Sequence, residues 1–187
     1  MGSLHQLPPD LPVPVDDGAA AHLTGLRMPA VHLASTAGRS LDVSQLGPGR
    51  TVIYLYPRTG LPDRPTPEGW DQIPGARGCT PESCGFRDHF QELAGLGASV
   101  FGLSTQDTEY QREAAVRLAL PFDLLSDSKF ELTEALRLPT FSFDGVRLVK
   151  RLTLVIRDGH IEHVFYPVFP PDGHAEQVLA WLRGHER

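Results

Sequence analysis

The sequence predicts an α/β domain in which helices flank a mixed central β-sheet, giving three layers. Two short apolar runs at residues 51–56 and 99–103 are rich in β-branched and aromatic side chains, and a helix-patterned segment separates them. This order is typical of a β-α-β unit with parallel strands. Asp158-Gly159 lies between two further strand-like runs and indicates a tight antiparallel hairpin. Parallel and antiparallel strands that alternate with helices favour the three-layer fold.

The length of the chain favours a single domain. A chain of 187 residues can bury a substantial core but is too short for two well-buried domains. Residues 1–24 contain four prolines and a string of alanines without periodicity, so we expect an extended or poorly ordered N-terminal arm that carries no function. The domain itself is expected over residues 25–187.

The elements of this domain can be placed in chain order. The strand at 51–56 is apolar throughout, which suits burial on both faces of a sheet. A helix over about residues 80–96 should follow, because Phe86, Phe90 and Leu93 recur on one helix face. The remaining expected elements are a strand over 99–103, a helix over 107–119 with an aspartate cap, a strand over 121–125, a helix over 128–137, hairpin strands over 152–157 and 160–165, and a final helix opened by Asp172.

Charge and hydropathy exclude several classes of partner. Lysine and arginine total 17 against 23 aspartates and glutamates, a net charge of -6, and no run of like charges occurs. Nucleic acid is therefore not an expected partner. No apolar stretch approaches the roughly 20 residues that span a bilayer, and the N-terminus has neither a basic leader nor a compact hydrophobic core. We expect a soluble, cytoplasmic protein without a membrane partner.

One long loop interrupts the expected order of elements. Residues 58–78 contain four prolines and four glycines, with Trp70 in the middle. A loop of this length in a compact domain is usually functional or disordered. It leads directly into Cys79, which favours a functional role.

The chain has only two cysteines, Cys79 and Cys84, five residues apart. In a reducing compartment such a pair indicates redox chemistry or metal binding rather than a permanent disulfide. Thr80 can cap a helix and Pro81 suits its first turn, which places Cys79 at a helix N-terminus. The free N–H groups there should lower the thiol pKa. Burial against Phe86 would raise that pKa, so a nearby cation is needed.

Helical geometry separates the two sulfurs. If both cysteines were helical, their Cα atoms would be roughly 8–9 Å and about 140° apart, beyond the usual disulfide span. A bond between Cys79 and Cys84 therefore requires the first turns of the helix to unwind. We infer a cycle in which the Cys79 thiolate attacks a peroxide, the resulting sulfenic acid condenses with Cys84, and an external dithiol reduces the disulfide.

Three other interpretations of the pair remain. The cysteines could be inert core residues, as free cysteines often are. A zinc site of Cys79, Cys84 and His89 lacks an obvious fourth ligand and has unusual spacing. In a thioredoxin-like dithiol reductase two residues would separate the cysteines, whereas four do here.

Ordered stretches of the chain resemble the peroxiredoxins, and closely the bacterioferritin comigratory protein or Q-type subfamily. The similarity runs from about Leu26 to Leu182. The matching stretches are Val52-Ile-Tyr-Leu-Tyr-Pro57, Gly78-Cys-Thr-Pro-Glu-Ser-Cys-Gly-Phe-Arg-Asp88, Gly102-Leu-Ser-Thr105, Pro121-Phe-Asp-Leu-Leu-Ser-Asp127 and Arg151-Leu-Thr-Leu-Val-Ile-Arg-Asp-Gly-His-Ile161.

The resemblance implies a thioredoxin-like fold and a thiol peroxidase that needs no metal or organic cofactor. It implies hydrogen peroxide or organic hydroperoxides as substrates, thioredoxin or a similar dithiol as reductant, and a monomer. Cys79 would be the peroxidatic cysteine and Cys84 the resolving one. Arg151 matches the family's active-site arginine, and its guanidinium would hold the thiolate and position the peroxide. The alternative is that Arg151 is simply an exposed arginine at the end of a strand.

The active-site loop departs from the family pattern of proline, three residues, threonine, two residues and cysteine. Pro57 matches the proline, but about 15 inserted residues follow, and Ala76 stands in the place of the threonine. Thr59 could return to the site if the insertion bulges out, and Arg77, Thr80 or main-chain N–H groups are other possible donors. The insertion is either a wall over the pocket, anchored by Trp70, or an exposed variation.

A second function of a different class uses the same chemistry. A peroxide-responsive redox sensor would form the same disulfide to signal to a partner protein. Slow peroxide consumption together with oxidation-dependent capture of a partner would favour it.

Overall fold

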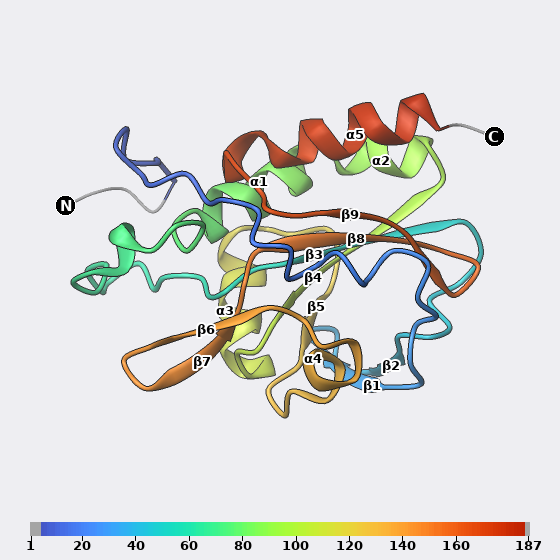
Figure 1. Cartoon of the computed structure of the whole chain (residues 1–187), viewed down its shortest axis with the longest axis horizontal. Coiled ribbons are helices and arrows are strands. Elements are labelled where there is room, and N and C mark those ends of the chain that lie inside the picture. Colours follow the sequence, from blue (N-terminus) through green and yellow to red (C-terminus); the bar gives the residue numbers. More distant parts are fainter. Residues whose placement is uncertain (1–4, 186–187) are drawn as a thin grey trace.

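A computed structural model of the chain describes residues 5–185. Its centre is a seven-stranded mixed sheet with the strand order β2-β1-β5-β4-β3-β8-β9 (Figure 1). The strands are β1 His32–Ser35, β2 Ser40–Asp42, β3 Arg50–Leu55, β4 Ala98–Ser104, β5 Leu124–Ser126, β8 Leu152–Arg157 and β9 His160–Phe165. Strand β4 runs parallel to β3 and β5, whereas β8 is antiparallel to β3 and β9. The prediction of a mixed sheet is confirmed.

Helices cover both faces of this sheet. They are α1 Cys79–Asp88, α2 Phe90–Gly95, α3 Thr108–Arg117, α4 Glu131–Leu136 and α5 His174–Gly184, with short 3-10 turns η1 Trp70–Gln72 and η2 Pro171–Gly173. In Figure 1, α1, α2 and α5 lie together along one side of the sheet, and α4 lies on the other. A two-stranded hairpin of β6 Thr140–Phe143 and β7 Val146–Val149 stands apart from the sheet.

The apolar run of β3 is explained by these layers. Successive side chains of a strand point to opposite faces. Ile53 and Leu55 accordingly join the apolar cluster on the side of α4, whereas Val52 and Tyr54 join the cluster that includes residues of α1 and α5. Burial on both faces requires apolar residues at every position of the strand, so β3 could be recognised from its composition.

Four expected boundaries were wrong, each for a local reason. The helix expected over 80–96 is broken at His89 between α1 and α2, although the apolar period continues across the break. The strand expected over 121–125 begins only at Leu124, because Pro121 cannot donate to a strand ladder. The helix expected over 128–137 comprises only α4, because Phe130 before it and Arg137 after it have left-handed backbone conformations. Asp172 does not cap α5, since it lies in η2 and the helix begins at His174.

The described part of the N-terminal arm packs on the domain without forming a helix or a strand. Leu23 is fully buried, and the Gly25 N–H donates to the carbonyl of Ile161 at 2.8 Å. Asp17 accepts hydrogen bonds from the Lys150 ammonium at 2.8 Å and from the Tyr166 hydroxyl at 2.7 Å. No helix within residues 5–185 is long and apolar enough to cross a membrane.

Candidate active site

Gly78 determines where helix α1 begins. Its φ of 110° is left-handed, and a Cβ at this position would lie 2.3 Å from Cγ of Pro171. Only glycine accepts this backbone conformation in this space without strain. Gly78 is the N-cap residue and Cys79 is the first residue of the helix, so the expectation that Thr80 caps it was wrong. The placement of Cys79 at the helix N-terminus was correct.

The sulfur of Cys79 lies against the guanidinium of Arg151. Arg151 immediately precedes β8, and its Nη2 donates to the Cys79 Sγ at 3.2 Å. The same guanidinium donates to the carbonyls of Gly75 at 3.1 Å, Ala76 at 3.1 Å and Arg77 at 3.3 Å. Both residues are 3 % exposed. The last residues of the insertion and the arginine of the sheet therefore hold each other in place around the sulfur.

Glu82 is a third ionisable group at this site, and the sequence reasoning missed it. Its carboxylate forms a buried ion pair with Arg151. Burial raises the pKa of Glu82 to about 7, and the charge and hydrogen bond of Arg151 oppose that rise. One carboxylate oxygen, Oε1, has no hydrogen-bond partner within the described chain. The spacing could have revealed this group, because a residue three positions after Cys79 lies on the same face of a helix.

The sequence predicted opposite effects on the pKa of Cys79, lowering by the helix N-terminus and raising by burial, and in the structure this pKa is raised. Burial raises the pKa of the thiol, Arg151 lowers it, and the carboxylate of Glu82 raises it again, with a net upward shift. The main-chain N–H of Arg58 acts in the same direction as Arg151. The cause of the net rise is the apolar cluster around the sulfur, which includes Phe86. A thiolate at Cys79 therefore depends on the guanidinium rather than on the helix terminus alone.

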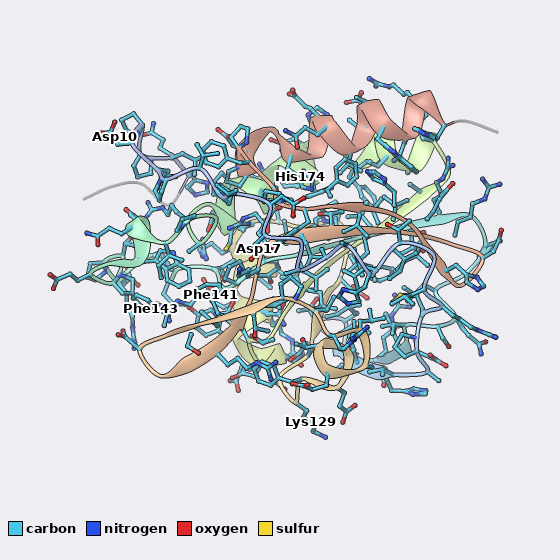
Figure 2. The ribbon with its side chains drawn as sticks, in the orientation of Figure 1. Asp10, Asp17, Lys129, Phe141, Phe143 and His174 are labelled. Carbon is cyan, nitrogen blue, oxygen red and sulfur yellow. The ribbon has the colours of Figure 1, made fainter. Side chains whose placement is uncertain are left out.

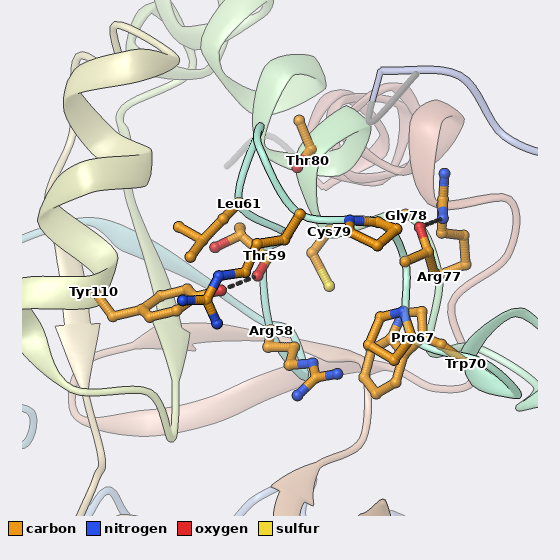
Figure 3. A pocket seen from close by; sticks show the side chains of 14 residues that line it. Arg58, Thr59, Leu61, Pro67, Trp70, Arg77, Gly78, Cys79, Thr80 and Tyr110 are labelled. Carbon is orange, nitrogen blue, oxygen red and sulfur yellow. Dashed lines mark hydrogen bonds between the residues drawn. The ribbon is translucent and has the colours of Figure 1, made fainter. Parts of the chain in front are cut away.

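A cavity of about 250 Å³ opens at Cys79, and most of its wall comes from the insertion. Its lining is Arg58, Thr59, Gly60, Leu61, Arg64, Pro65, Thr66, Pro67, Trp70, Arg77, Gly78, Cys79, Thr80 and Tyr110. In Figure 3 the sulfur of Cys79 points into the space between Thr59, Arg58 and Trp70. Of the two interpretations of the insertion, the structure supports the wall.

The structure brings Thr59 and Thr80 to this cavity, whereas Pro57 lies buried beneath it. The Pro57 carbonyl accepts a hydrogen bond from the Ser104 hydroxyl at 3.0 Å. Thr59 is fixed through its backbone: its N–H donates to Gln106 at 3.1 Å, and its carbonyl accepts from the Tyr110 hydroxyl at 2.8 Å. The Thr59 hydroxyl is buried and has no hydrogen-bond partner within residues 5–185. Thr59 thus lines the same cavity as Cys79, although it lies 20 positions earlier in the sequence.

Trp70 anchors the insertion to the β6–β7 hairpin. Its ring lies 5.1 Å from the ring of Phe143 and 6.1 Å from that of Phe141, and the side chain is 5 % exposed. Figure 2 shows both phenylalanines on the edge of the hairpin that faces the insertion. The guanidinium carbon of Arg58 lies 4.6 Å above the Trp70 ring. This small apolar cluster keeps the wall of the cavity in position.

Cys84 is not brought together with Cys79. Both cysteines are free and both belong to α1, so five helical residues place their Cα atoms on different sides of the axis. The Cys84 sulfur is half-buried and lies 3.8 Å from Nδ1 of His5. Burial raises the pKa of Cys84, and the charge of Arg87 opposes that rise. Within the described chain, no three histidine, cysteine or acidic side chains come together to hold a metal ion. Cys79, Cys84 and His89 therefore do not form such a cluster there.

Comparisons with known proteins give consistent matches. A family model described as Redoxin matches residues 23–179. Peroxiredoxin Bcp of Escherichia coli (strain K12) is 30% identical over 163 residues, 84% of this chain and 93% of the relative. The chloroplastic peroxiredoxin Q of Suaeda salsa is 28% identical over 160 residues, 85% of this chain and 67% of the relative. The crystal structure of peroxidoxin BcpB from Mycobacterium tuberculosis matches with a TM-score of 0.72 and 29% identity, and the match covers 89% of this chain and 100% of that one.

The structural match also confirms the thioredoxin-like fold that the resemblance implied. The chain therefore belongs to the Redoxin family, in which it is a peroxiredoxin of the Bcp and peroxiredoxin Q type, a thiol peroxidase.

Proposed function

We propose that the protein reduces hydrogen peroxide and organic hydroperoxides with Cys79 as the attacking thiolate and Arg151 as its cation. The observation that carries the proposal is the 3.2 Å contact between Nη2 of Arg151 and Sγ of Cys79 at a cavity that a peroxide can enter. The guanidinium stabilises the thiolate and can donate a second hydrogen bond to the peroxide oxygens. It thus holds the nucleophile and the O–O bond in line.

The chemical step balances without a cofactor. The Cys79 thiolate attacks one oxygen of the peroxide, so that an S–O bond forms while the O–O bond breaks. The departing alkoxide or hydroxide takes up a proton and leaves as an alcohol or water. Sulfur is oxidised by two electrons to the sulfenic acid, and the peroxide is reduced by two.

Thr59 is our candidate for the missing threonine of the active-site loop. Its buried hydroxyl has no other partner within the described residues, and it lines the same cavity as Cys79. A hydroxyl in that position can donate to the peroxide and accept from it. Thr80 lines the cavity as well, and Pro57 supports the strand end from below. We assign Thr59 the substrate contact and the other two secondary roles.

Cys84 is proposed to resolve the sulfenic acid. Its thiolate attacks the Cys79 sulfur, an S–S bond forms, and the hydroxyl leaves as water after protonation. Because both cysteines lie in α1, the first turns of that helix must unwind before the sulfurs can meet. A thioredoxin-like dithiol would then reduce the disulfide and return two electrons. A monomeric state and a cytoplasmic location remain predictions.

The direct test couples peroxide consumption to the oxidation of reduced thioredoxin. We expect turnover by the wild type, none by Cys79→Ser, and arrest after one oxidation in Cys84→Ser. Mass spectrometry after one equivalent of peroxide should show the loss of two hydrogens and a link between Cys79 and Cys84. Unchanged turnover of Cys84→Ser would remove the resolving role. Slow consumption with capture of a partner protein on oxidation would favour the redox sensor instead.

A further inference from the structure

We propose that the cavity over Cys79 selects organic hydroperoxides that carry a carboxylate, which Arg58 and Arg64 bind. This inference rests on the proposed peroxidase function and names the substrate class of the same site. Both arginines belong to the insertion that replaces the short family loop, and both line the cavity into which the sulfur points (Figure 3).

The charge of the lining is one-sided. Three arginines and no carboxylate line the cavity. Arg77 is engaged with the Asp71 carboxylate at 3.2 Å and with the Thr66 hydroxyl. Arg58 and Arg64 have no acidic side chain within salt-bridge distance among residues 5–185. Two guanidinium groups therefore face a partly enclosed space with their charge uncompensated, which favours an anion there.

Arg58 is held ready for such a contact. Its guanidinium carbon lies 4.6 Å from the centre of the Trp70 ring and 5.4 Å from that of Phe143. Stacking on aromatic faces restricts the side chain and leaves the in-plane N–H groups of the guanidinium free to donate. Less conformational entropy is then lost when a carboxylate binds in a bidentate manner. Arg64 is exposed at the mouth of the cavity and adds a second positive charge.

The size of the cavity also favours an organic substrate. A volume of about 250 Å³ greatly exceeds what one hydrogen peroxide molecule fills, given that a water molecule occupies about 30 Å³ in the liquid. Leu61, Pro65, Pro67 and Trp70 supply apolar parts of the same lining. A hydroperoxide with an apolar body and a carboxylate at its other end would satisfy both parts of the lining.

The test compares two peroxides with the same body, one with a free carboxylate and one with that carboxylate esterified. They are 4-(2-hydroperoxypropan-2-yl)benzoate and its methyl ester, with hydrogen peroxide as the small reference. We expect the second-order rate constant for Cys79 oxidation to be about 10-fold higher for the carboxylate than for the ester, the value of one partly exposed charge-assisted contact. The ratio should decrease as salt is added, because exposed charges are screened.

Variants locate the contact. In Arg58→Gln/Arg64→Gln the ratio of the rate constants for the carboxylate and the ester should fall to about 1, because neither arginine remains to bind the carboxylate. The single variant Arg64→Gln changes only an exposed side chain and should show a partial fall even if the double variant folds poorly. Arg157→Gln removes the same charge at the far end of β8 and should keep the wild-type ratio.

The outcomes separate this inference from the function on which it rests. If all three peroxides oxidise Cys79 but the ester reacts as fast as the carboxylate, the selection by charge is wrong and the peroxidase stands. A carboxylate preference that persists in the double variant would also overturn it, because the arginines would not be its cause. If none of the three oxidises Cys79, the proposed function itself fails.

Discussion

Replacing Arg151 by methionine should slow the oxidation of Cys79 by about two to three orders of magnitude, as removal of a single oxyanion-type donor does in other enzymes. The variant keeps most of the length and volume of the side chain and removes its charge and its donors. It therefore removes the hydrogen bond to the Cys79 sulfur at 3.2 Å together with the nearest cation.

The contact distance bounds the size of this effect. A hydrogen bond to a charged group contributes about 1.5–3 kcal/mol to stability. Two unit charges 3.2 Å apart at an effective dielectric constant of 20 interact by roughly 5 kcal/mol. Glu82 shares the guanidinium charge, so we take a value between these two. A loss of about 3–4 kcal/mol corresponds to a decrease of roughly 150-fold to 900-fold in rate.

Stopped-flow fluorescence can measure the step, because Trp70 lines the same cavity as the reacting sulfur. Removing Arg151 alone leaves Glu82 buried without its cation, so Arg151→Met/Glu82→Gln provides a variant without an isolated charge. Arg157→Met, at the far end of β8 and away from the site, is the control and should react like the wild type. A rate within about threefold of the wild type in folded Arg151→Met and in the double variant would refute the role of Arg151.

Three further predictions follow from the same region. Thr59→Val keeps the shape of the side chain and loses one hydroxyl hydrogen bond, so Cys79 oxidation should slow by about 2-fold to 10-fold in stopped flow; an unchanged rate would exclude the contact. Trp70→Ala removes the anchor of the insertion and should lower the free energy of unfolding in urea by about 3 kcal/mol, with faster proteolysis within residues 58–78; resistance equal to the wild type would contradict this. Burial lowers the pKa of His174 from 6.5 to about 4. This shift contributes about 3 kcal/mol to the free energy of unfolding above pH 6.5, and the contribution is lost as the pH falls toward 4. The contribution of Glu82 depends on pH in the opposite direction, because its pKa is raised from 4.5 to about 7. This contribution stabilises the fold at low pH and is lost as the pH rises. Stability measured from pH 6.5 to 4.5 should therefore fall more steeply in Glu82→Gln than in the wild type, and equal slopes would contradict the assignment.

The parts of the fold that the sequence predicted are those that local composition determines. Strand β3 could be recognised because both of its faces are buried, and Cys79 could be placed at a helix start because Pro81 suits a first turn, although the cap is Gly78 and not Thr80. The break at His89 could not be foreseen, since the apolar period runs through it. Strand and helix boundaries shifted where a proline or a left-handed residue outweighed the pattern.

Cys79 could be predicted from its position at a helix start, and its cation only from the resemblance. Arg151 was assigned from the matching strand, and the structure places its guanidinium on the sulfur. The return of Thr59 depends on how the insertion folds, which is set by the packing of Trp70 on a distant hairpin rather than by any local pattern. Glu82 was missed because only the two cysteines on either side of it were considered as reactive groups. Contacts between segments far apart in sequence are the part that single-sequence reasoning cannot supply.

Glu82 and Cys79 compete for one cation, and this competition determines how readily the thiolate forms. Arg151 contacts both acids, burial raises the pKa of each, and the carboxylate charge raises the pKa of the thiol further. Glu82→Gln keeps a hydrogen-bonding group of the same shape while it removes the charge, so the whole guanidinium charge becomes available to the sulfur. The Cys79 pKa, measured from the ultraviolet absorbance of the thiolate, should therefore fall, and oxidation at neutral pH should become faster because more of the thiol is ionised.

The opposite result would also be informative about the mechanism. If the Cys79 pKa rises in Glu82→Gln, the carboxylate acts chiefly by orienting the guanidinium, and its loss lets Arg151 turn away from the sulfur. An Arg151→Lys variant separates the two effects, because an ammonium keeps the charge but cannot donate to the sulfur and to Glu82 in the same fixed plane. A pKa in Arg151→Lys equal to that of the wild type would show that charge alone suffices. We expect it to lie above the wild type, since the geometry of the guanidinium places one nitrogen on each acid.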